Sequence, residues 1–366
     1  MTNLPDIPTR IVLAPMAGGL DTPELVAAVG RAGGFGFLPS GYLSADRLRA
    51  DLARVRALSE VSPDVRAGDG GGDGAGFGVN LFVPAPPDAE RTRRAEAYAE
   101  HLRVWAGSRD VTVEAPAYTD DDYPAKVALL LEERPSVVSF TFGLPEAAVV
   151  DAFHEARIAV VITVTSPQEA LATVAGGADT LAAQGWEAGA HQGGWLPNDE
   201  HWGLLPLLQA VLDQVDVPVM AAGGIATGRA VAAVLTLGAH AAMLGTAFMN
   251  CPEAGTSPAH AAALMTQTPT MMTRAFTGRP ARSLSNAFAR RFDRDAPDAY
   301  PEVHVATSGM RGQARARSNL DGFHLWAGQS HALTRSVPAA DLVAALDTEA
   351  RAARKGGATS TDKTPE

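Results

Sequence analysis

Short apolar runs alternate with longer mixed segments over most of the chain. Eight runs are rich in hydrophobic residues, and most of them end at or beside glycine or proline; they lie at 10–19, 33–39, 77–83, 137–143, 159–165, 178–182, 217–224 and 241–248. A strand with one wet face alternates polar and apolar residues, whereas a strand buried on both faces does not. The pattern therefore predicts eight parallel strands inside an α/β protein.

Several of the segments between the runs carry the signals of a helix start. Thr22 and Pro23 suit the N-cap and the first position of one helix, and Ser166, Pro167 and Glu169 combine a cap, a first-turn proline and a capping-box residue. Eight strand–helix units in succession predict a closed (β/α)8 barrel of the TIM type. A doubly wound open sheet is the structural alternative.

The rhythm changes after the eighth run. The next seventy or so residues include an arginine-rich stretch, 274–294, of which 283–294 is expected to be a basic helix, and they predict a small, mostly helical cap. Residues 67–76 contain only glycine, alanine and aspartate, which predicts a flexible insertion. We expect a barrel over 1–248, a cap or substrate domain over 249–320, a return to the barrel over 321–354 and a disordered tail over 355–366.

Composition narrows the function. The net charge of −11 argues against nucleic acid or an anionic membrane surface as the main partner, and no run approaches the length of a membrane span. The single cysteine, Cys251, excludes an internal disulfide framework and fits a reducing cytoplasm. His191, His201 and His240 lack the paired spacing of a zinc site, and no Gly-x-Ser-x-Gly elbow indicates a hydrolase. We expect no metal and a small-molecule substrate.

The loops after the seventh and eighth runs suggest a phosphate site. In barrels these two loops often bind phosphate through backbone N–H groups. Gly223 and Gly224 follow the seventh run, and Met243, Leu244, Gly245 and Thr246 stand in the eighth. Neither loop has a lysine, so a P-loop nucleotide site is not expected. The alternative is that these glycines only make tight turns.

A phosphorylated ligand lying across the strand ends would meet a ring of backbone groups, two amides and a thioether. The residues concerned are Pro15, Met16, Ala17, Gly18, Asn80, Gln184 and Gly189. Amides can pair with both donors and acceptors on a heterocycle, and flavin mononucleotide (FMN) has this shape. His191 would then lie near the ring, where a neutral imidazole could remove a proton from substrate. A solvated surface histidine is the alternative.

Taken together, these segments resemble a known family, the nitronate monooxygenases, formerly called 2-nitropropane dioxygenases. The resemblance runs in order from about residue 10 to residue 335. It rests on the segments 14–19, 78–82, 139–143, 183–191, 221–225, 245–248, 276–282 and 326–330.

The resemblance implies a barrel that holds FMN non-covalently and a cap that closes over the site. It places Asn80, Gln184, Gly189, Gly224 and segment 243–246 at flavin contacts and His191 at the catalytic histidine. It also implies oxidation of alkyl nitronates, such as propionate 3-nitronate, with O2 to carbonyl compounds and nitrogen oxides through a flavin semiquinone. His191 would act as a base toward a neutral nitroalkane and would stabilise charge on a nitronate. A homodimer is compatible with the resemblance.

Two residues beside His191 depart from the family pattern. Ala190 stands where the family has a second glycine, and Gln192 stands where it usually has an arginine. A methyl group restricts backbone approach, and loss of a cation removes help for an anionic substrate. Arg279 or Arg282 of the cap could supply that charge.

Three rival functions stay open at this level. A flavin- and NAD(P)H-dependent enoyl-acyl carrier protein reductase belongs to the same barrel superfamily. A barrel that binds a phosphorylated sugar or nucleotide would not be a flavoprotein. A flavin-binding member without activity would fit the altered residues around His191.

Overall fold

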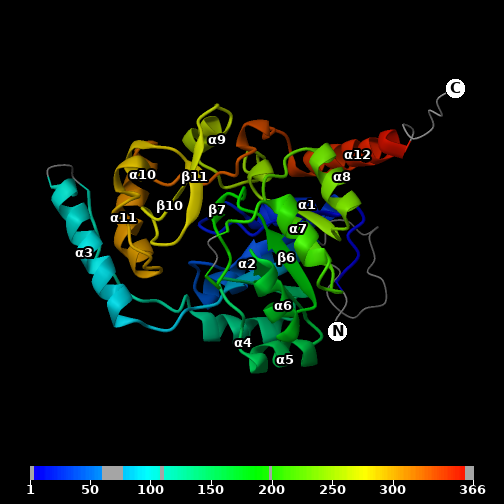
Figure 1. The fold of residues 1–366 in the computed structure, drawn as a ribbon, viewed down its shortest axis with the longest axis horizontal. Helices are drawn as coiled ribbons and strands as arrows, with labels where there is room; N and C mark the ends of the chain where they lie inside the picture. Colours follow the sequence, from blue (N-terminus) through cyan, green and yellow to red (C-terminus); the bar gives the residue numbers. More distant parts are fainter. Residues whose placement is uncertain (1–3, 60–76, 108–110, 198–199, 359–366) are drawn as a thin grey trace.

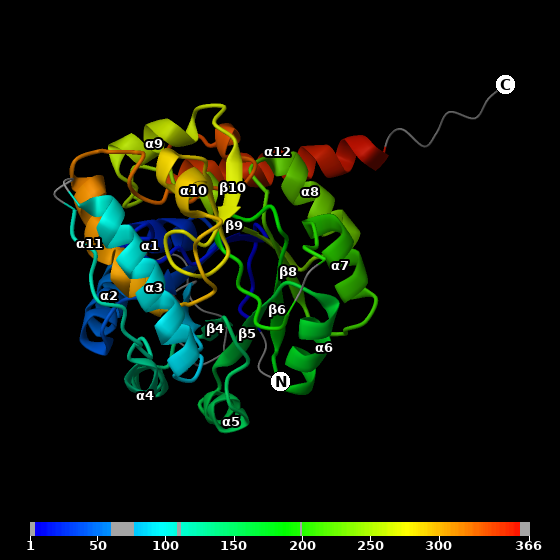
Figure 2. The same ribbon diagram turned by 60° about the vertical axis from the view of Figure 1, so that its left-hand side comes forward.

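The computed structural model describes residues 4–59, 77–107, 111–197 and 200–358, and it shows a closed eight-stranded barrel (Figure 1, Figure 2). The prediction of a (β/α)8 barrel is therefore confirmed, and the open sheet is not formed. Neighbouring strands are parallel throughout, and the last strand pairs with the first. The barrel strands are β1 (Ile11–Leu13), β2 (Phe35–Pro39), β3 (Phe77–Phe82), β4 (Val137–Thr141), β5 (Ala159–Val164), β6 (Thr180–Gln184), β8 (Val219–Ala222) and β9 (Ala241–Leu244).

A ring of helices covers the outside of the barrel. The last long helix, α12, packs between α8 and α1, so the chain returns from the cap to close the ring. The expected tail begins at residue 355, whereas α12 continues to Ala358; later residues, like the insertion 67–76, lie outside the described ranges. The ring consists of α1 (Pro23–Arg31), α2 (Ala45–Ser59), α4 (Tyr123–Glu133), α5 (Ala147–Glu155), α6 (Pro167–Ala175), α7 (Leu204–Leu212), α8 (Gly228–Leu237) and α12 (Ala339–Ala358).

The caps expected from sequence form at the helix starts. The Thr22 hydroxyl accepts from the Leu25 N–H, and the Ser166 hydroxyl accepts from the Glu169 N–H. Each contact satisfies one of the amide groups that a helix leaves without a partner in its first turn. The sequence thus fixes where α1 and α6 begin.

A second, three-stranded sheet joins the cap to the barrel. Its strands are β10 (Thr270–Thr273), β11 (Ala281–Leu284) and the two-residue β7 (Ala190–His191), in the order β10-β11-β7. The basic helix that we expected over 283–294 is therefore wrong at its start, because Ser283 and Leu284 pair with β10. The helix there, α10 (Ala287–Phe292), begins after the Asn286 cap.

The cap also contains a helix from the first half of the chain. The cap helices are α9 (Pro258–Leu264), α10 and α11 (Glu302–Ala316), and α3 (Ala89–Ala106) lies beside α11 (Figure 2). Tyr98 and Leu102 of α3 share one buried cluster with Phe276 and Phe292. We expected α3 within the barrel region, but its apolar face packs on the cap.

The apolar side chains inside the barrel form one buried cluster, and those beneath the helices form another. Phe35, Phe37, Val161 and Met220 pack with other strand residues inside the barrel, and Ile7 belongs to the same buried cluster. Polar side chains replace this apolar filling at the carboxyl ends of the strands, where Asn80, Ser139 and Gln184 lie.

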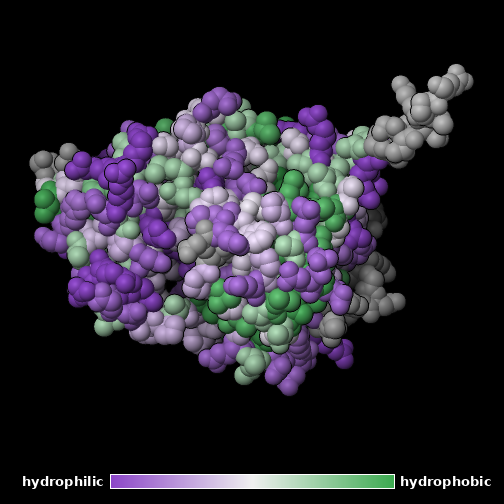
Figure 3. All heavy atoms as spheres, in the orientation of Figure 1, coloured by the Kyte–Doolittle hydropathy of each residue, from purple (hydrophilic) through white to green (hydrophobic). Residues whose placement is uncertain are grey.

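The outer surface shows one contrast between the barrel and the cap. Figure 3 shows hydrophobic residues over α6 and α7, where Leu171 and Leu205 are about half exposed, and a mainly hydrophilic surface over α3 and α11. Among the helices of the described ranges, none has the length and apolar content that crossing a lipid bilayer requires.

Candidate active site

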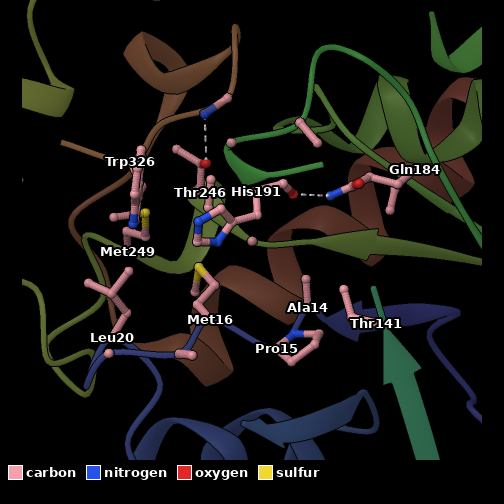
Figure 4. Close-up of a pocket in the computed structure, with 18 of the residues that line it drawn as sticks. Ala14, Pro15, Met16, Leu20, Thr141, Gln184, His191, Thr246, Met249 and Trp326 are labelled. Carbon is pink, nitrogen blue, oxygen red and sulfur yellow. Dashed lines mark hydrogen bonds between the residues drawn. The ribbon is translucent and has the colours of Figure 1, made fainter. Parts of the chain in front are cut away.

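A cavity of about 370 Å³ opens at the carboxyl ends of the barrel strands, beneath the cap (Figure 4). This is the end of a (β/α)8 barrel where active sites lie, and the volume falls in the range of small-molecule sites. Every residue that we predicted to bind cofactor lines this cavity, and so does His191. The cofactor candidates are Pro15, Met16, Ala17, Gly18, Asn80, Gln184, Gly189, Gly223, Gly224, Met243, Leu244, Gly245 and Thr246.

The glycine loops after β8 and β9 form one side of the cavity. Gly223 and Gly224 have φ angles of +114° and +68°, a left-handed conformation that glycine adopts without strain. The Ser330 hydroxyl donates to the Gly224 carbonyl over 2.7 Å, and the Thr246 hydroxyl accepts from the Gly328 N–H over 3.0 Å. Thr246 therefore keeps its own O–H free to donate to a ligand.

Asn80 lies on the opposite side of the barrel mouth, because β3 is four strands from β8 in the closed sheet. Its side-chain nitrogen donates to the hydroxyls of Ser139 and Thr141, both over 3.0 Å. β3 pairs with β4 so that Asn80 is the register partner of Ser139, which explains the contact. The amide nitrogen is thus held by the barrel, and the amide oxygen has no hydrogen-bond partner among the described residues.

Gln184 holds the loop that carries His191. Its Nε2 donates to the His191 carbonyl over 3.1 Å, and its Oε1 accepts from the Gly193 N–H over 2.7 Å. One side-chain amide at the end of β6 therefore fixes both sides of the loop. Its contact with a flavin stays a prediction, but this positioning task is visible in the structure.

His191 points into the cavity from β7, toward Met16 and Trp326 (Figure 4). Its backbone pairs with Ala281 of β11, and its Nε2 lies 2.9 Å from the Thr277 hydroxyl. The same hydroxyl can donate instead to the Arg279 carbonyl, over a longer distance of 3.3 Å. If the hydroxyl donates to the nearer atom, Nε2, then Nδ1 carries the imidazole proton.

Burial and two cations keep His191 uncharged. Desolvation is the largest cause, followed by the nearby charges of Arg279 and Arg311, and together they lower the pKa of His191 to about 3. The imidazole is therefore neutral throughout the physiological pH range. A group with so low a pKa is a weak base, and its one N–H can still donate a hydrogen bond to an anion.

Arg279 and Arg282 do not line the cavity, so our expectation that one of them faces the substrate is corrected. Arg279 donates to the backbone carbonyls of Gln192 and Gly194, and its guanidinium lies 4.1 Å from the centre of the Phe142 ring. Arg282 donates to the Trp186 carbonyl over 2.7 Å and 3.1 Å. Arg282 thus holds the loop between β6 and β7 against the cap, and Arg279 holds the segment that follows β7.

The structure adds cavity residues that sequence reasoning missed. Arg311 and Arg315 reach the cavity from α11 together with His304, and Trp326 lies beside His191. The signal that could have found them is the spacing of His304, Arg311 and Arg315 at i, i+7 and i+11, which places them on one helix face. The arginine-rich stretch 274–294, which we expected to supply the charge, contributes no arginine to the cavity wall.

The donors and acceptors around the cavity fit a ligand with a polar-edged planar ring and a terminal phosphate. Two glycine loops and a free hydroxyl lie on one side, where backbone can approach phosphate oxygens. The free amide oxygen of Asn80 lies across the barrel mouth, at a position that can accept from a ring N–H. No group of three or more His, Cys, Asp or Glu side chains within the described ranges could hold a metal ion.

A closed barrel with a cavity at its strand ends, a neutral histidine at β7 and a covering cap defines an enzyme of the (β/α)8 class. The family model described as nitronate monooxygenase matches residues 2–349. The nitronate monooxygenase of Paraburkholderia phytofirmans is 38% identical over 93% of this chain and 91% of its own. The chain therefore belongs to the nitronate monooxygenase family, whose members are flavin-dependent oxidoreductases.

Solved structures agree with this assignment. The nitroalkane oxidase from Streptomyces ansochromogenes is 43% identical, with a TM-score of 0.89 over 96% of this chain and 98% of its own. FabK from Thermotoga maritima is 26% identical, with a TM-score of 0.74 over 98% of this chain and 97% of its own. The fold is shared by both, and the nitroalkane oxidase is the more similar of the two.

The two departures beside His191 now have a structural description. Ala190 has a φ angle of +61°, which is in the left-handed region. This conformation costs alanine free energy that it does not cost glycine. Gln192 is buried outside the cavity, and its side-chain nitrogen has no hydrogen-bond partner among the described residues. The missing cation at 192 therefore removes no charge from the cavity wall.

We predict that Ala190→Gly stabilises the protein by about 0.5–1 kcal/mol, because glycine relieves the unfavourable backbone angle. Chemical denaturation followed by circular dichroism measures the change. Ala188→Gly, two residues earlier and outside the left-handed region, is the control and should destabilise. Equal effects of the two substitutions would show that the angle at 190 carries no strain.

Proposed function

We propose that this protein uses FMN to oxidise alkyl nitronates, propionate 3-nitronate among them, with O2 to carbonyl compounds and nitrite or other nitrogen oxides. The observation that carries the proposal is a neutral His191 on the wall of a cavity that also contains a cationic arginine, Arg311. A nitronate is an anion, so this wall suits it better than it suits a neutral nitroalkane.

The barrel residues would hold the cofactor. The loops after β8 and β9 would bind the phosphate through backbone N–H groups and the Thr246 hydroxyl, and Asn80 would accept from the ring edge. Bound FMN would supply the electron acceptor for the nitronate. The protein's own part is to bind both partners and to exclude water beneath the cap.

His191 would stabilise charge rather than remove a proton. With Thr277 donating to Nε2, the Nδ1–H can donate to a nitronate oxygen. Protonation of Nε2 would add a third positive charge beside those of Arg279 and Arg311, and this repulsion contributes to the lowered pKa of His191. The geometry therefore favours substrates that arrive as nitronates.

The reductase alternative has less support. An enoyl reductase domain, that of MlnA from Bacillus amyloliquefaciens, is 12% identical to this chain, and a likeness at that level concerns the fold alone. Except for FabK, the family model and the relatives named above are described as nitronate monooxygenases or as a nitroalkane oxidase.

We expect the purified holoenzyme to consume O2 when it is given propionate 3-nitronate and to remain oxidised when it is given NADPH without air. The measurement is the visible flavin spectrum under anaerobic conditions, followed by readmission of air. Bleaching by NADPH together with no response to nitronate would replace our proposal with the reductase. A protein that takes up no FMN would remove the cofactor assignment.

Replacing His191 tests the assigned role. Asparagine carries an N–H near the position of Nδ1 but cannot act as a base, so we expect His191→Asn to keep nitronate kcat/KM within about tenfold. His191→Ala removes the donor and should lose about 10- to 100-fold, the worth of one charge-assisted hydrogen bond. Because His191 is not assigned as a base, turnover of neutral nitroalkane should fall no further than turnover of nitronate in either variant. Equal nitronate losses in the two variants, with FMN still bound, would reject the donor role.

The phosphate loop is tested by Gly224→Val, which we expect to abolish FMN retention because the side chain blocks backbone approach. The φ angle at 224 is +68°, so the substitution also strains the backbone. Gly238→Val is the matched control, because Gly238 has a φ angle of +117° at the end of α8 and does not line the cavity. Flavin content per folded protein is the readout, and a Gly224→Val protein with full FMN would contradict the assignment.

A further inference from the structure

One face of the cap helix α11 lines the cavity over much of its length. His304, Ser308, Arg311 and Arg315 stand at i, i+4, i+7 and i+11, and all four border the cavity. At 1.5 Å per residue this stripe is about 16 Å long. It therefore extends well beyond the part of a substrate that would react beside His191.

Two arginines on this stripe have no acidic partner. Arg311 is 6% exposed, and burial lowers its pKa to about 10, so it remains charged at neutral pH. Among the described residues, its guanidinium contacts the Thr307 hydroxyl, the His304 backbone and two imidazoles, and Arg315 contacts His324; neither pairs with a carboxylate. A buried cation such as Arg311 is normally paired, and Arg315 is exposed beside it, so this wall has positive charge to offer a ligand.

The contacts of His324 with the two arginines cannot both be hydrogen bonds. Arg311 Nη1 lies 3.2 Å from Nδ1 of His324, and Arg315 Nη2 lies 3.0 Å from Nε2. A neutral imidazole has one nitrogen that accepts and one that donates, whereas a guanidinium only donates. One of the two contacts therefore brings two N–H groups together. An anion that accepts from that guanidinium would relieve the conflict.

The cationic wall lies one aromatic ring away from His191. The centre of the Trp326 ring is 5.5 Å from that of His191 and 4.6 Å from that of His324. A second cavity of about 30 Å³ adjoins Arg315, His324 and Trp326 on the same side. Arg311, but not Arg315, is among the charges that act on His191, and Arg315 stands four residues, about 6 Å of helix rise, further along α11. A ligand that reaches Arg315 from His191 is therefore longer than one that ends at Arg311.

We propose that Arg311 and Arg315 form a carboxylate-binding subsite, and that the enzyme selects nitronates whose chain carries a carboxylate several methylene groups from the reacting carbon. The subsite rests on the proposed function for the reaction at the other end of the substrate. The planar guanidinium groups match a carboxylate in geometry as well as charge. Ser308 and Gly312, which also line the cavity, leave room for the intervening chain.

The test compares two nitronates of equal chain length on the FMN-loaded enzyme, those of 6-nitrohexanoate and of 1-nitrohexane. We expect kcat/KM to favour the carboxylate by at least about tenfold, and Arg315→Gln to bring the ratio close to one. Arg315→Lys, which keeps the charge, should restore part of the preference. Arg290→Gln removes an exposed cap arginine that does not line the cavity, and it should leave the ratio unchanged.

Binding without turnover separates this subsite from the reaction. In calorimetry, hexanedioate should bind at least about tenfold more tightly than hexanoate, and Arg315→Gln should remove the difference. Arg311→Met is the second variant if Arg315→Gln loses its thermal transition. Equal affinities for the two acids overturn the subsite whatever the fate of nitronate oxidation. Failure to oxidise either nitronate, with the difference in affinity intact, overturns the proposed function alone.

Discussion

The pairing of β7 with β11 is the contact on which the arrangement of the site depends. It consists of two register pairs, His191 with Ala281 and Ala190 with Arg282. Through it the loop after β6 becomes a strand of the cap sheet, and His191 is held by both parts of the protein. Gln184 fixes the same loop from the barrel side, and Arg279 fixes it from the cap side. The imidazole is thus held between the barrel and the cap by contacts from both.

The barrel could be predicted from sequence because its strands are buried on both faces, which leaves a strong apolar signal in each. The residues that we expected to bind cofactor line one cavity for a related reason: the carboxyl ends of parallel strands meet at one edge of the barrel. Sequence order alone therefore brings Asn80, Gln184 and Gly224 together. The resemblance to the nitronate monooxygenases then indicated FMN among the ligands that such a ring of residues could hold.

Other parts of the site left no readable signal. β7 has two residues in a glycine-rich loop, and its partner β11 is about ninety residues away, so neither has the alternation of a strand. Residues 281–284 contain good helix formers, but tertiary pairing with β10 overrides that preference. In the sequence, Arg311 and Arg315 look like ordinary charged residues on the solvent-exposed face of a helix. Only the packing of α11 against the barrel mouth shows that Arg311 is buried and that both arginines line the cavity, and composition does not encode that packing.

The position of α3 has a consequence for how the chain folds. The cap draws α3 from residues 89–106 and its other helices from beyond residue 257, and the two groups meet in one apolar cluster. Contacts between segments so far apart in sequence close large loops and form late. The cap therefore cannot be excised as a continuous cassette, since removal of 249–320 would expose the apolar face of α3. The pairing of β7 with β11 likewise joins segments about ninety residues apart, so His191 reaches its working position only when both segments are in place.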